Sequence, residues 1–211
     1  MKKVLIAIVA ISTVIISCKG EKKEKLEVKE EVKVEKAVAQ NNVDLSASLL
    51  SWKGTKPGGA HNGTVALKES SLVVENGKIS SGEFLVDMSS IKNLDIKSPE
   101  YGAKLVAHLS NEDFFDVTKY PTSKFVITSV EEKEGKLAVT GNLTIKDVTK
   151  SITIPATLSQ ENGVHVFKSE TFNIDRADFN VKHKSKRFFD NLKDKFIDDL
   201  VEMSFEVRTK A

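Results

Sequence analysis

The sequence lacks most of the side chains that metal-dependent and thiol-based catalysis requires. It contains one cysteine and four histidines in 211 residues, so no disulfide can form within the chain. His61, His108, His165 and His183 do not stand at metal-ligand spacing from one another, although folding can bring distant histidines together. No glycine-rich segment has the spacing of a phosphate-binding loop. We therefore expect no catalytic residues, no metal site and no required cofactor.

An excess of charge of one sign is also absent. The chain carries 32 Lys and Arg against 30 Asp and Glu, which gives a formal net charge of +2 at pH 7. Domains that bind nucleic acid usually need a strongly basic surface, and this balance does not supply one. Nucleic acid is therefore not expected as a partner, and composition leaves the oligomeric state open.

The chain begins with a short positive segment and an apolar run. Two lysines precede residues 4–16, which are apolar apart from one serine and one threonine, and Cys18 follows closely. The run suits a signal peptide and is shorter than the ~20 residues of a membrane-spanning helix. It resembles a bacterial lipoprotein signal, in which residues 1–17 are removed and the cysteine is lipidated. Ile15 stands where such signals favour leucine, and an ordinary secretory signal is the alternative.

Residues 18–43 form a highly charged segment. Seven lysines and six glutamates fall within residues 19–36, so the two signs nearly balance. This composition can bury little apolar surface, and we expect a flexible tether between the lipidated cysteine and a folded domain. A helix that binds a partner is the alternative.

Residues 44–211 are expected to fold as one domain that is almost entirely β-structure. Asn76 and Gly77 stand between apolar runs and predict a hairpin, and residues 161–164 predict another. A basic segment at residues 184–196 predicts a short helix or a loop. The expected strand regions are residues 47–54, 63–69, 70–77, 78–88, 123–130, 137–145, 151–158, 164–181 and 199–210.

One segment breaks this pattern and predicts a helix. Ser98 is a good N-cap, and Pro99 suits the first helical position because it needs no backbone donor there. Tyr101, Leu105 and Leu109 follow at intervals of four, which predicts one apolar face.

About eight or nine strands joined mainly by short turns favour an antiparallel meander that closes into a barrel. A barrel of ~8 strands can hold packed side chains or one small ligand. A β-sandwich is the structural alternative. The expected fold class is therefore all-β with minor helices.

Several polar residues have alternative interpretations. His61 stands in a glycine-rich loop that could present it to an opening, and a hydrogen bond that stabilises the loop is the alternative. His108 and His183 are expected at the surface. Asp147 and Asn180 are expected in turns, where both residue types tolerate a left-handed backbone.

An ordered set of segments resembles the YceI-like, polyisoprenoid-binding family. The segments are WKGTKPGGAHNGTV, GEFLVDMSSI, HLSNEDFFDVTKYPTSKF, VTGNLTIKDVTKSITIP and FNIDRADFNV, and DDLVEMSFEV matches the closing strand. The chain departs from the family at Asp147 and Asn180, where glycine is usual. The resemblance implies an extended, lipocalin-like antiparallel barrel of about eight strands, with an apolar cavity that holds a long lipid, typically an isoprenoid chain. It also implies export to the periplasm and no established catalysis.

The resemblance makes the aromatic residues candidates for the cavity wall. All eleven phenylalanines lie at or after Phe84, so none falls in the tether. Phe114 and Phe115 follow the expected helix and could enter one end of the barrel, where they either line a tunnel or fill a core. The candidate apolar lining consists of Trp52, Phe84, Phe114, Phe115, Phe125, Phe172 and Ile174.

His61 and Arg176 are the candidates for contact with a lipid head group. Period-two alternation places Arg176 on the same face as two apolar residues of its strand, so we expect it to point inward. A buried guanidinium needs a partner. Three partners remain open, namely a carboxylate such as Asp87 or Asp116, a group of backbone carbonyls, or the head group itself.

The function expected from the sequence is therefore non-enzymatic. The protein is expected to carry or store a quinone-type or polyprenyl-type lipid in the cell envelope, attached to a membrane through Cys18. The expected location faces the periplasm or the cell surface, with the outer membrane favoured. A structural or stress-related envelope lipoprotein without a ligand is the alternative. A continuous apolar tunnel would favour carriage, and large side chains meeting across the axis would favour a structural role.

Overall fold

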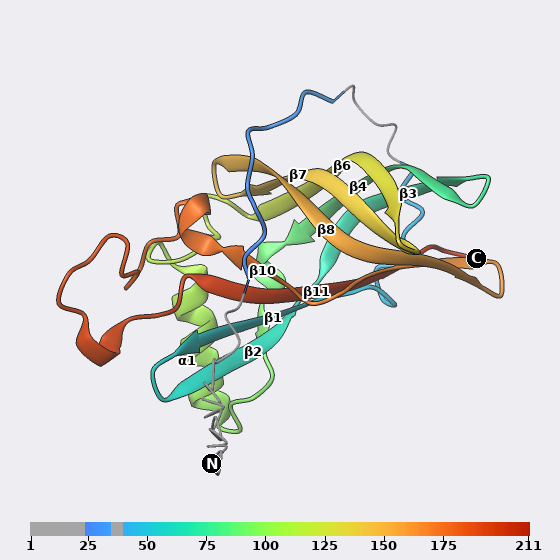
Figure 1. Ribbon diagram of the computed structural model, residues 1–211. Helices are drawn as coiled ribbons and strands as arrows, with labels where there is room; N and C mark the ends of the chain where they lie inside the picture. The colour runs from blue at the N-terminus through green and yellow to red at the C-terminus, as the bar shows by residue number, and fades with distance from the viewer. Residues whose placement is uncertain (1–23, 35–39) are drawn as a thin grey trace, which may run out of the picture.

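The computed structural model describes residues 24–34 and 40–211, which form a strongly curled antiparallel sheet with one α-helix beside it (Figure 1). The expected signal peptide and Cys18 lie outside the described residues. The strands are β1 Leu49–Lys56, β2 Gly59–Val65, β3 Leu67–Glu75, β4 Lys78–Asp87, β5 Lys92–Asn93, β6 Thr122–Lys133, β7 Lys136–Ile145, β8 Val148–Glu161, β9 Val164–Ser169, β10 Phe172–Asp175 and β11 Leu200–Arg208. The helices are α1 Pro99–Ser110 and three short 3₁₀ helices, η1 Met88–Ser90, η2 Arg176–Phe179 and η3 Lys193–Lys195.

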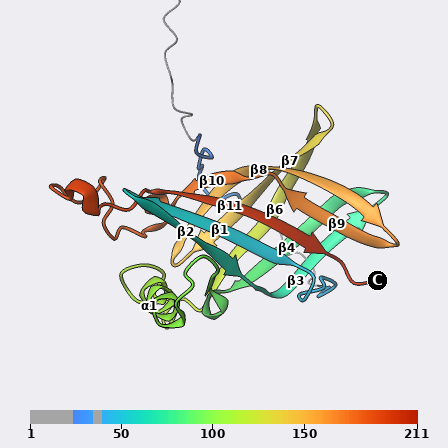
Figure 2. The ribbon, with the colours of Figure 1, turned by 90° about the horizontal axis from the view of Figure 1, so that it is seen from below.

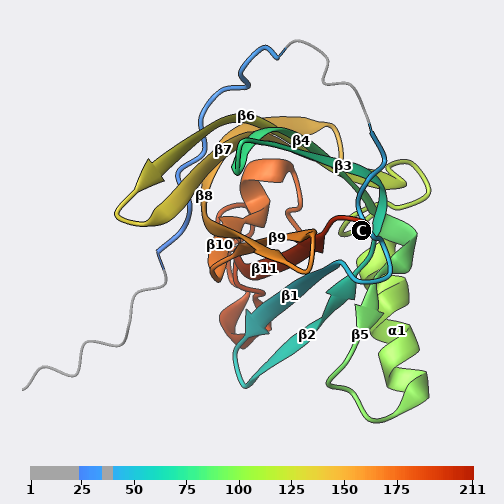
Figure 3. The same ribbon diagram turned by 90° about the vertical axis from the view of Figure 1, so that its right-hand side faces the viewer.

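The strands form a single sheet in the order β3-β4-β6-β7-β8-β9-β11-β1-β2-β5, and β10 pairs with β11. The path ends at β3 and at β5, so its hydrogen bonds leave a half-barrel (Figure 3). The all-β antiparallel class is confirmed. Contrary to expectation, the sheet does not close fully, because its two end strands, β3 and β5, do not pair with each other. The strand count is higher than expected because residues 164–181 form two strands, β9 and β10, and because the short strand β5 was not expected.

At its free edge, β3 is hydrogen-bonded by the side chain of Asn42 rather than by another strand. The Asn42 side chain accepts from the backbone N–H of Leu72 at 3.0 Å and donates to its carbonyl at 2.8 Å. The next residue, Val43, forms a bridge with Thr209 and is almost fully buried. These contacts join the β3 edge to the end of β11 and satisfy backbone groups that would otherwise attract another chain.

The hairpins form where the turn residues predicted them. Asn76 and Gly77 have φ values of 51° and 74°, which suit the two-residue turns that match the twist of paired strands. Asn180 is left-handed as expected, with φ 61°. Asp147 lies in the expected turn between β7 and β8, but the preceding Lys146 takes the left-handed position, with φ 56°. Asp147 instead accepts a hydrogen bond from the Tyr120 hydroxyl at 3.2 Å.

Alternation along β7 sets the inner face of the sheet. Val139, Gly141 and Ile145 point inward and are buried. Gly141 is required by packing, since a Cβ there would overlap the ring of Phe125 and the carbonyl of Val126. Because Gly141 has no side chain, the ring of Phe125 can pack against the backbone of β7 on the inner face.

The helix forms with the expected N-cap. Ser98 Oγ accepts from the backbone N–H of Tyr101 at 3.5 Å, and proline occupies the first turn. The expected apolar face is only partly correct, because Tyr101 is exposed while Leu105 and Leu109 border the interior. The reason is that α1 lies beside the short strand β5 at the rim of the sheet (Figure 3).

Residues 24–34, here called the outer segment, do not form the expected solvated tether. The segment runs along the outside of the sheet, where β9 leaves the first half of β8 unpaired (Figure 1). Lys29 exchanges two backbone hydrogen bonds with Ser151, at 2.8 and 2.9 Å, and Leu26 N–H donates to the Asn173 carbonyl at 2.9 Å. The Asn142 side chain bonds both backbone groups of Val32, at 3.0 and 2.6 Å. The segment is therefore ordered by polar backbone pairing, which its charged composition did not predict.

Candidate functional site: an apolar cavity with a polar rim

The curled sheet encloses a cavity of about 580 Å³. This volume falls within the ~300–1,000 Å³ typical of sites for small molecules. Helix α1 and the loop at residues 182–198 border the cavity at one end, and the C-terminus lies at the other end of the sheet (Figure 2). Apolar side chains from β1, β4, β6, β7, β8, β10 and β11 make most of its wall. They include Leu50, Val86, Leu143, Ile145, Ile152, Val201, Met203 and Val207.

All seven residues proposed as apolar lining border this cavity. They are Trp52, Phe84, Phe114, Phe115, Phe125, Phe172 and Ile174. The structure therefore brings them together from five different parts of the chain, and their role in ligand binding stays a prediction. Sequence reasoning missed several aliphatic members of the wall, although the alternation in β7 and β11 had marked their inward faces.

Aromatic side chains fill the space behind one part of the wall. The Phe167 ring is almost fully buried and lies 5.9 Å from Phe84 and 4.8 Å from Phe205, measured between ring centroids. Phe172 lies 6.5 Å from Phe205. The phenylalanines thus have both roles that the sequence left open. Phe167 packs in a core behind the wall, while its neighbours Phe84 and Phe205 border the cavity. Phe114 and Phe115 also border it.

Trp52 combines an apolar surface with an unused polar atom. Its side chain lines the cavity, and its ring packs so closely against Gly63 that a Cβ at that position would overlap it. The indole Nε1 is buried and has no hydrogen-bond partner among residues 24–34 and 40–211. Buried donors are usually paired, so this N–H is a candidate contact for a polar group of a ligand.

His61 lies at the cavity and is held in place by Asp95. Its Nδ1 is 2.9 Å from Asp95 Oδ2, while Asp95 Oδ1 accepts from the Asn62 backbone N–H at 2.9 Å. Burial disfavours the ionised carboxylate, but hydrogen bonds from Asn62, His61 and Asn93 outweigh it and lower the pKa of Asp95 from 3.8 to about 2. His61 lies in β2 rather than in the expected glycine-rich loop, and it combines a stabilising hydrogen bond to Asp95 with a position at the cavity.

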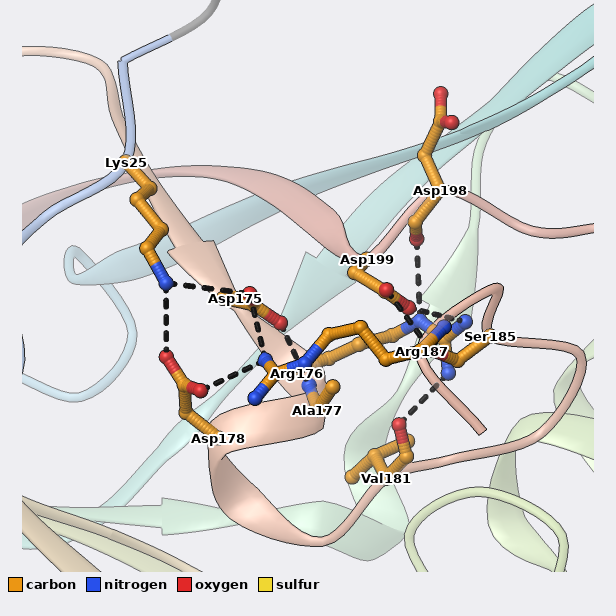
Figure 4. Close-up of polar contacts among 10 residues, drawn as sticks. All are labelled: Lys25, Asp175, Arg176, Ala177, Asp178, Val181, Ser185, Arg187, Asp198 and Asp199. Carbon is orange, nitrogen blue, oxygen red and sulfur yellow. Dashed lines mark hydrogen bonds and ion pairs between the residues drawn. The ribbon is translucent and has the colours of Figure 1, made fainter. Parts of the chain in front are cut away.

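Arg176 points inward as expected, and backbone carbonyls surround its guanidinium (Figure 4). Nε donates to the Asp198 carbonyl at 3.1 Å, Nη1 to Val181 at 2.7 Å and Nη2 to Ile197 at 3.0 Å. Nη2 also lies 3.1 Å from Asp199 Oδ1, with the geometry of an ion pair rather than a hydrogen bond. Burial lowers the pKa of Arg176, and the nearby carboxylates oppose that effect.

The partners of Arg176 differ from the carboxylates that the sequence suggested. Neither Asp87 nor Asp116 is among them, because Asp87 caps η1 and Asp116 lies in the turn after α1. Asp199 supplies the charge, and Ser185 Oγ donates to its other oxygen at 2.8 Å. Arg176 borders the cavity, but its donors are directed to protein carbonyls. This geometry favours the structural role over the head-group role.

A second group of charged side chains, around Asp175 next to Arg176 in the sequence, joins neighbouring segments by ion pairs. Arg187 Nη1 contacts Asp175 at 2.9 Å and Asp178 at 2.8 Å, and Lys25 from the outer segment lies 3.4 Å from the same two carboxylates (Figure 4). These contacts tie the loop after η2 and the outer segment to β10.

His108 lies at the surface as expected, with its side chain 40% exposed, whereas the expectation was wrong for His183, whose side chain is only 19% exposed. Their rings lie 5.0 Å apart at 82°, and both pack against Phe114 beside the cavity. Asp113 reaches both rings, with one oxygen 3.1 Å from His108 Nε2 and the other 3.6 Å from His183 Nδ1. The ligand atoms of all three residues lie within 4.8 Å of one another. Distant sequence positions meet here because the loop after η2 folds back against the end of α1.

Comparison with known proteins identifies relatives of the whole domain. Residues 41–209 match the YceI-like domain. A UPF0312 protein of Pseudomonas savastanoi pv. phaseolicola is 42% identical over 81 residues, which cover 36% of this chain and 42% of the relative. A UPF0312 protein of Shewanella denitrificans is 48% identical over 50 residues, which cover 23% of this chain and 26% of the relative. The aligned regions thus span less than half the length of these curated relatives.

Solved structures share the fold at lower identity. Burkholderia cenocepacia BcnA superposes with a TM-score of 0.66 and 24% identity, covering 80% of this chain and 99% of that protein. A polyisoprenoid binding domain from Saccharophagus degradans superposes with a TM-score of 0.58 and 14% identity, covering 80% and 97%. At these identities the likeness shows the fold. Among the described residues, no helix has the length and apolar character needed to cross a membrane.

Proposed function

Because the chain belongs to the YceI-like family, we propose that it binds a long apolar lipid of the isoprenoid type inside the half-barrel, for carriage or storage. One observation carries the proposal, namely the cavity of about 580 Å³ with walls of aliphatic and aromatic side chains. Removing an apolar chain from water into such a space contributes ~25 cal/mol per Å² of buried apolar surface. The Saccharophagus neighbour, described as a polyisoprenoid binding domain, supports the choice of ligand class.

Polar atoms at two places in the wall supply contacts for the ligand's polar end. Asp95 holds His61 through Nδ1, which orients the imidazole at the cavity. Trp52 offers a buried N–H that has no partner in the described part of the chain. We assign the head group to these two residues in preference to Arg176, whose guanidinium already contacts three carbonyls and Asp199.

The envelope location is part of the same proposal and rests on the N-terminal sequence. Residues 4–16 and Cys18 resemble a lipoprotein signal, and a lipidated cysteine would hold the domain at a membrane, with the outer membrane favoured. A lipoprotein carries more than one acyl chain, which matters because a single chain binds a membrane only marginally. A carrier held at a membrane would exchange its lipid over a short distance.

A ligand-free structural envelope lipoprotein is the second candidate, and no catalysis is proposed for either. The buried aromatic cluster around Phe167 is the feature that favours a structural role. The cavity favours carriage, because the side chains around it do not meet across the space they enclose.

Extraction of the purified chain with organic solvent, followed by mass spectrometry, tests the proposal. We expect an apolar chain to copurify in a fixed ratio with the wild type. Leu143→Trp on the inner face of β7 should lower that ratio by filling the cavity, whereas Thr140→Trp on the outer face should leave it unchanged. Equal lipid content in both variants, or none in the wild type after reconstitution with a polyprenol, would favour the structural alternative.

A further inference from the structure

We propose that His108, Asp113 and His183 form a binding site for a divalent transition metal ion, with Zn²⁺ as the expected occupant. The three side chains come from the last turn of α1, the turn after it and the loop that follows η2. Their ligand atoms all lie within 4.8 Å of one another. This site lies beside the cavity and is separate from the lipid contacts proposed above.

The distances between the side chains suit a small ion with nitrogen and oxygen ligands. Zn²⁺ bonds nitrogen and oxygen at ~2.0–2.1 Å, which places the ligand atoms of a tetrahedral site about 3.3 Å apart. His108 Nε2 lies 3.1 Å from one Asp113 oxygen, and His183 Nδ1 lies 3.6 Å from the other. Small rotations of the side chains would bring one atom from each residue onto a common ion.

Aromatic packing holds the two imidazoles in place. His183 Nε2 is buried and has no hydrogen-bond partner among the residues that the structure describes, and Nδ1 is the ring nitrogen that faces Asp113. Phe114 packs against both imidazoles at about 5 Å and holds them at the site.

The donor set also selects the kind of ion. Two imidazoles and one carboxylate suit Zn²⁺ and its neighbours in the first transition series, whereas Ca²⁺ and Mg²⁺ need oxygen-rich sites. The side chains of His108 and Asp113 are 40% and 47% exposed, so an ion can reach the site from solvent. A bound ion would link the end of α1 to the loop after η2, and both border the cavity.

Titration of the full chain with Zn²⁺ tests the site. All proteins should carry Cys18→Ser and no polyhistidine tag, so that neither the thiol nor a tag can bind the ion. Isothermal calorimetry should show one equivalent of Zn²⁺ in this background. His183→Gln and Asp113→Asn should each weaken binding at least tenfold, since even indirect supports of a metal site contribute 10–100-fold to affinity. His165→Gln, a change outside the cluster, is the matched control and should bind as tightly as the parent.

Two further measurements separate loss of the site from loss of the fold. Without metal, His183→Gln should keep the circular dichroism spectrum of the parent. With Co²⁺, the parent and His165→Gln should develop the visible absorption of a coordinated ion, and His183→Gln should not. The proposal is overturned if the parent binds no ion, if His183→Gln binds as tightly as the parent, or if His165→Gln weakens binding to the same degree.

Discussion

Two polar clusters lie at the rim of the cavity, and they differ in how fully their side chains are paired. Arg176 is 5% exposed, and its three donating nitrogens reach backbone carbonyls at 2.7–3.1 Å. His183 is 19% exposed, yet its Nε2 finds no partner in the described part of the chain. The Arg176 cluster uses its polar atoms to hold the protein together, and the His183 cluster leaves a buried polar atom unpaired.

The difference shows that a buried guanidinium favours a structural role, whereas a buried imidazole can remain without a partner. A guanidinium cannot lose its proton, so it must be fully paired to be buried at an acceptable free energy. An imidazole can become neutral, and a neutral ring tolerates an unpaired nitrogen at a smaller cost. The head-group role once considered for Arg176 is therefore weaker than the structural role, while the histidine cluster keeps the capacity to bind a ligand.

Arg176→Gln should have the largest effect, because the shorter side chain leaves the Val181 and Ile197 carbonyls without their donor and Asp199 without its ion-pair partner. We expect the free energy of unfolding to fall by about 3–5 kcal/mol. Arg187→Gln is the control, since Arg187 is 46% exposed and its ion pairs should contribute about 0–1 kcal/mol. Urea denaturation of lipid-free protein measures both. A loss below ~1 kcal/mol for Arg176→Gln, together with a lower content of copurified lipid, would restore the head-group interpretation.

Asp199→Asn and Asp113→Asn compare the carboxylates of the two clusters. Asp199 is largely buried, pairs with Arg176 and accepts from Ser185, so its neutralisation should lower the free energy of unfolding by about 2 kcal/mol. Asp113 is half exposed, and its neutralisation should change stability by less than ~1 kcal/mol when a chelator is present. Urea denaturation in the presence of EDTA measures the free energy of unfolding of both variants. Equal losses would show that both clusters are structural.

Of the two clusters, only the histidine cluster should respond to a change of pH. The resulting change in the free energy of unfolding should be smaller than the changes caused by the substitutions above. The pKa of His183 is lowered from 6.5 in the folded state, mainly by burial, so the unfolded chain takes up a proton at higher pH than the folded chain. The contribution of neutral His183 is fully present above about pH 6.5 and is lost as the pH falls through its lowered folded value. Arg176 stays protonated throughout this range.

Thermal melts between pH 7.5 and pH 5 check the sign of this effect. Wild type and His165→Gln should lose stability on acidification more steeply than His183→Gln. Parallel pH profiles for all three proteins would mean that His183 has the same pKa in the folded and unfolded states.

Local sequence was informative wherever a side chain acts through its own stretch of backbone. Asn76 and Gly77 gave the hairpin, Ser98 and Pro99 gave the start of α1, and alternation marked the inner faces of β7 and β11. It failed where partners come from elsewhere in the chain. The charges of residues 24–34 predicted a tether, because their pairing with Ser151 and Asn142 depends on backbone and side-chain groups more than 100 residues away.

The candidate site divides in the same way. Its apolar wall could be predicted, because a strand with one apolar face must bury that face and aromatic side chains gain most from doing so. The partners of its polar residues could not. Alternation showed that Arg176 points inward, but it could not show that Asp199, rather than Asp87 or Asp116, would meet it.

The sequence by itself determined the class of the fold, the inward faces of its strands and the kinship with the YceI-like family. Those properties depend on period-two patterning and turn residues, which are local and repeat along the chain. Only the tertiary structure decided that the ladder stays open between β3 and β5, that the outer segment covers β8, and that His108 meets His183. Each of these depends on where the curl of the sheet brings distant groups within a few ångströms, and no local pattern encodes that distance.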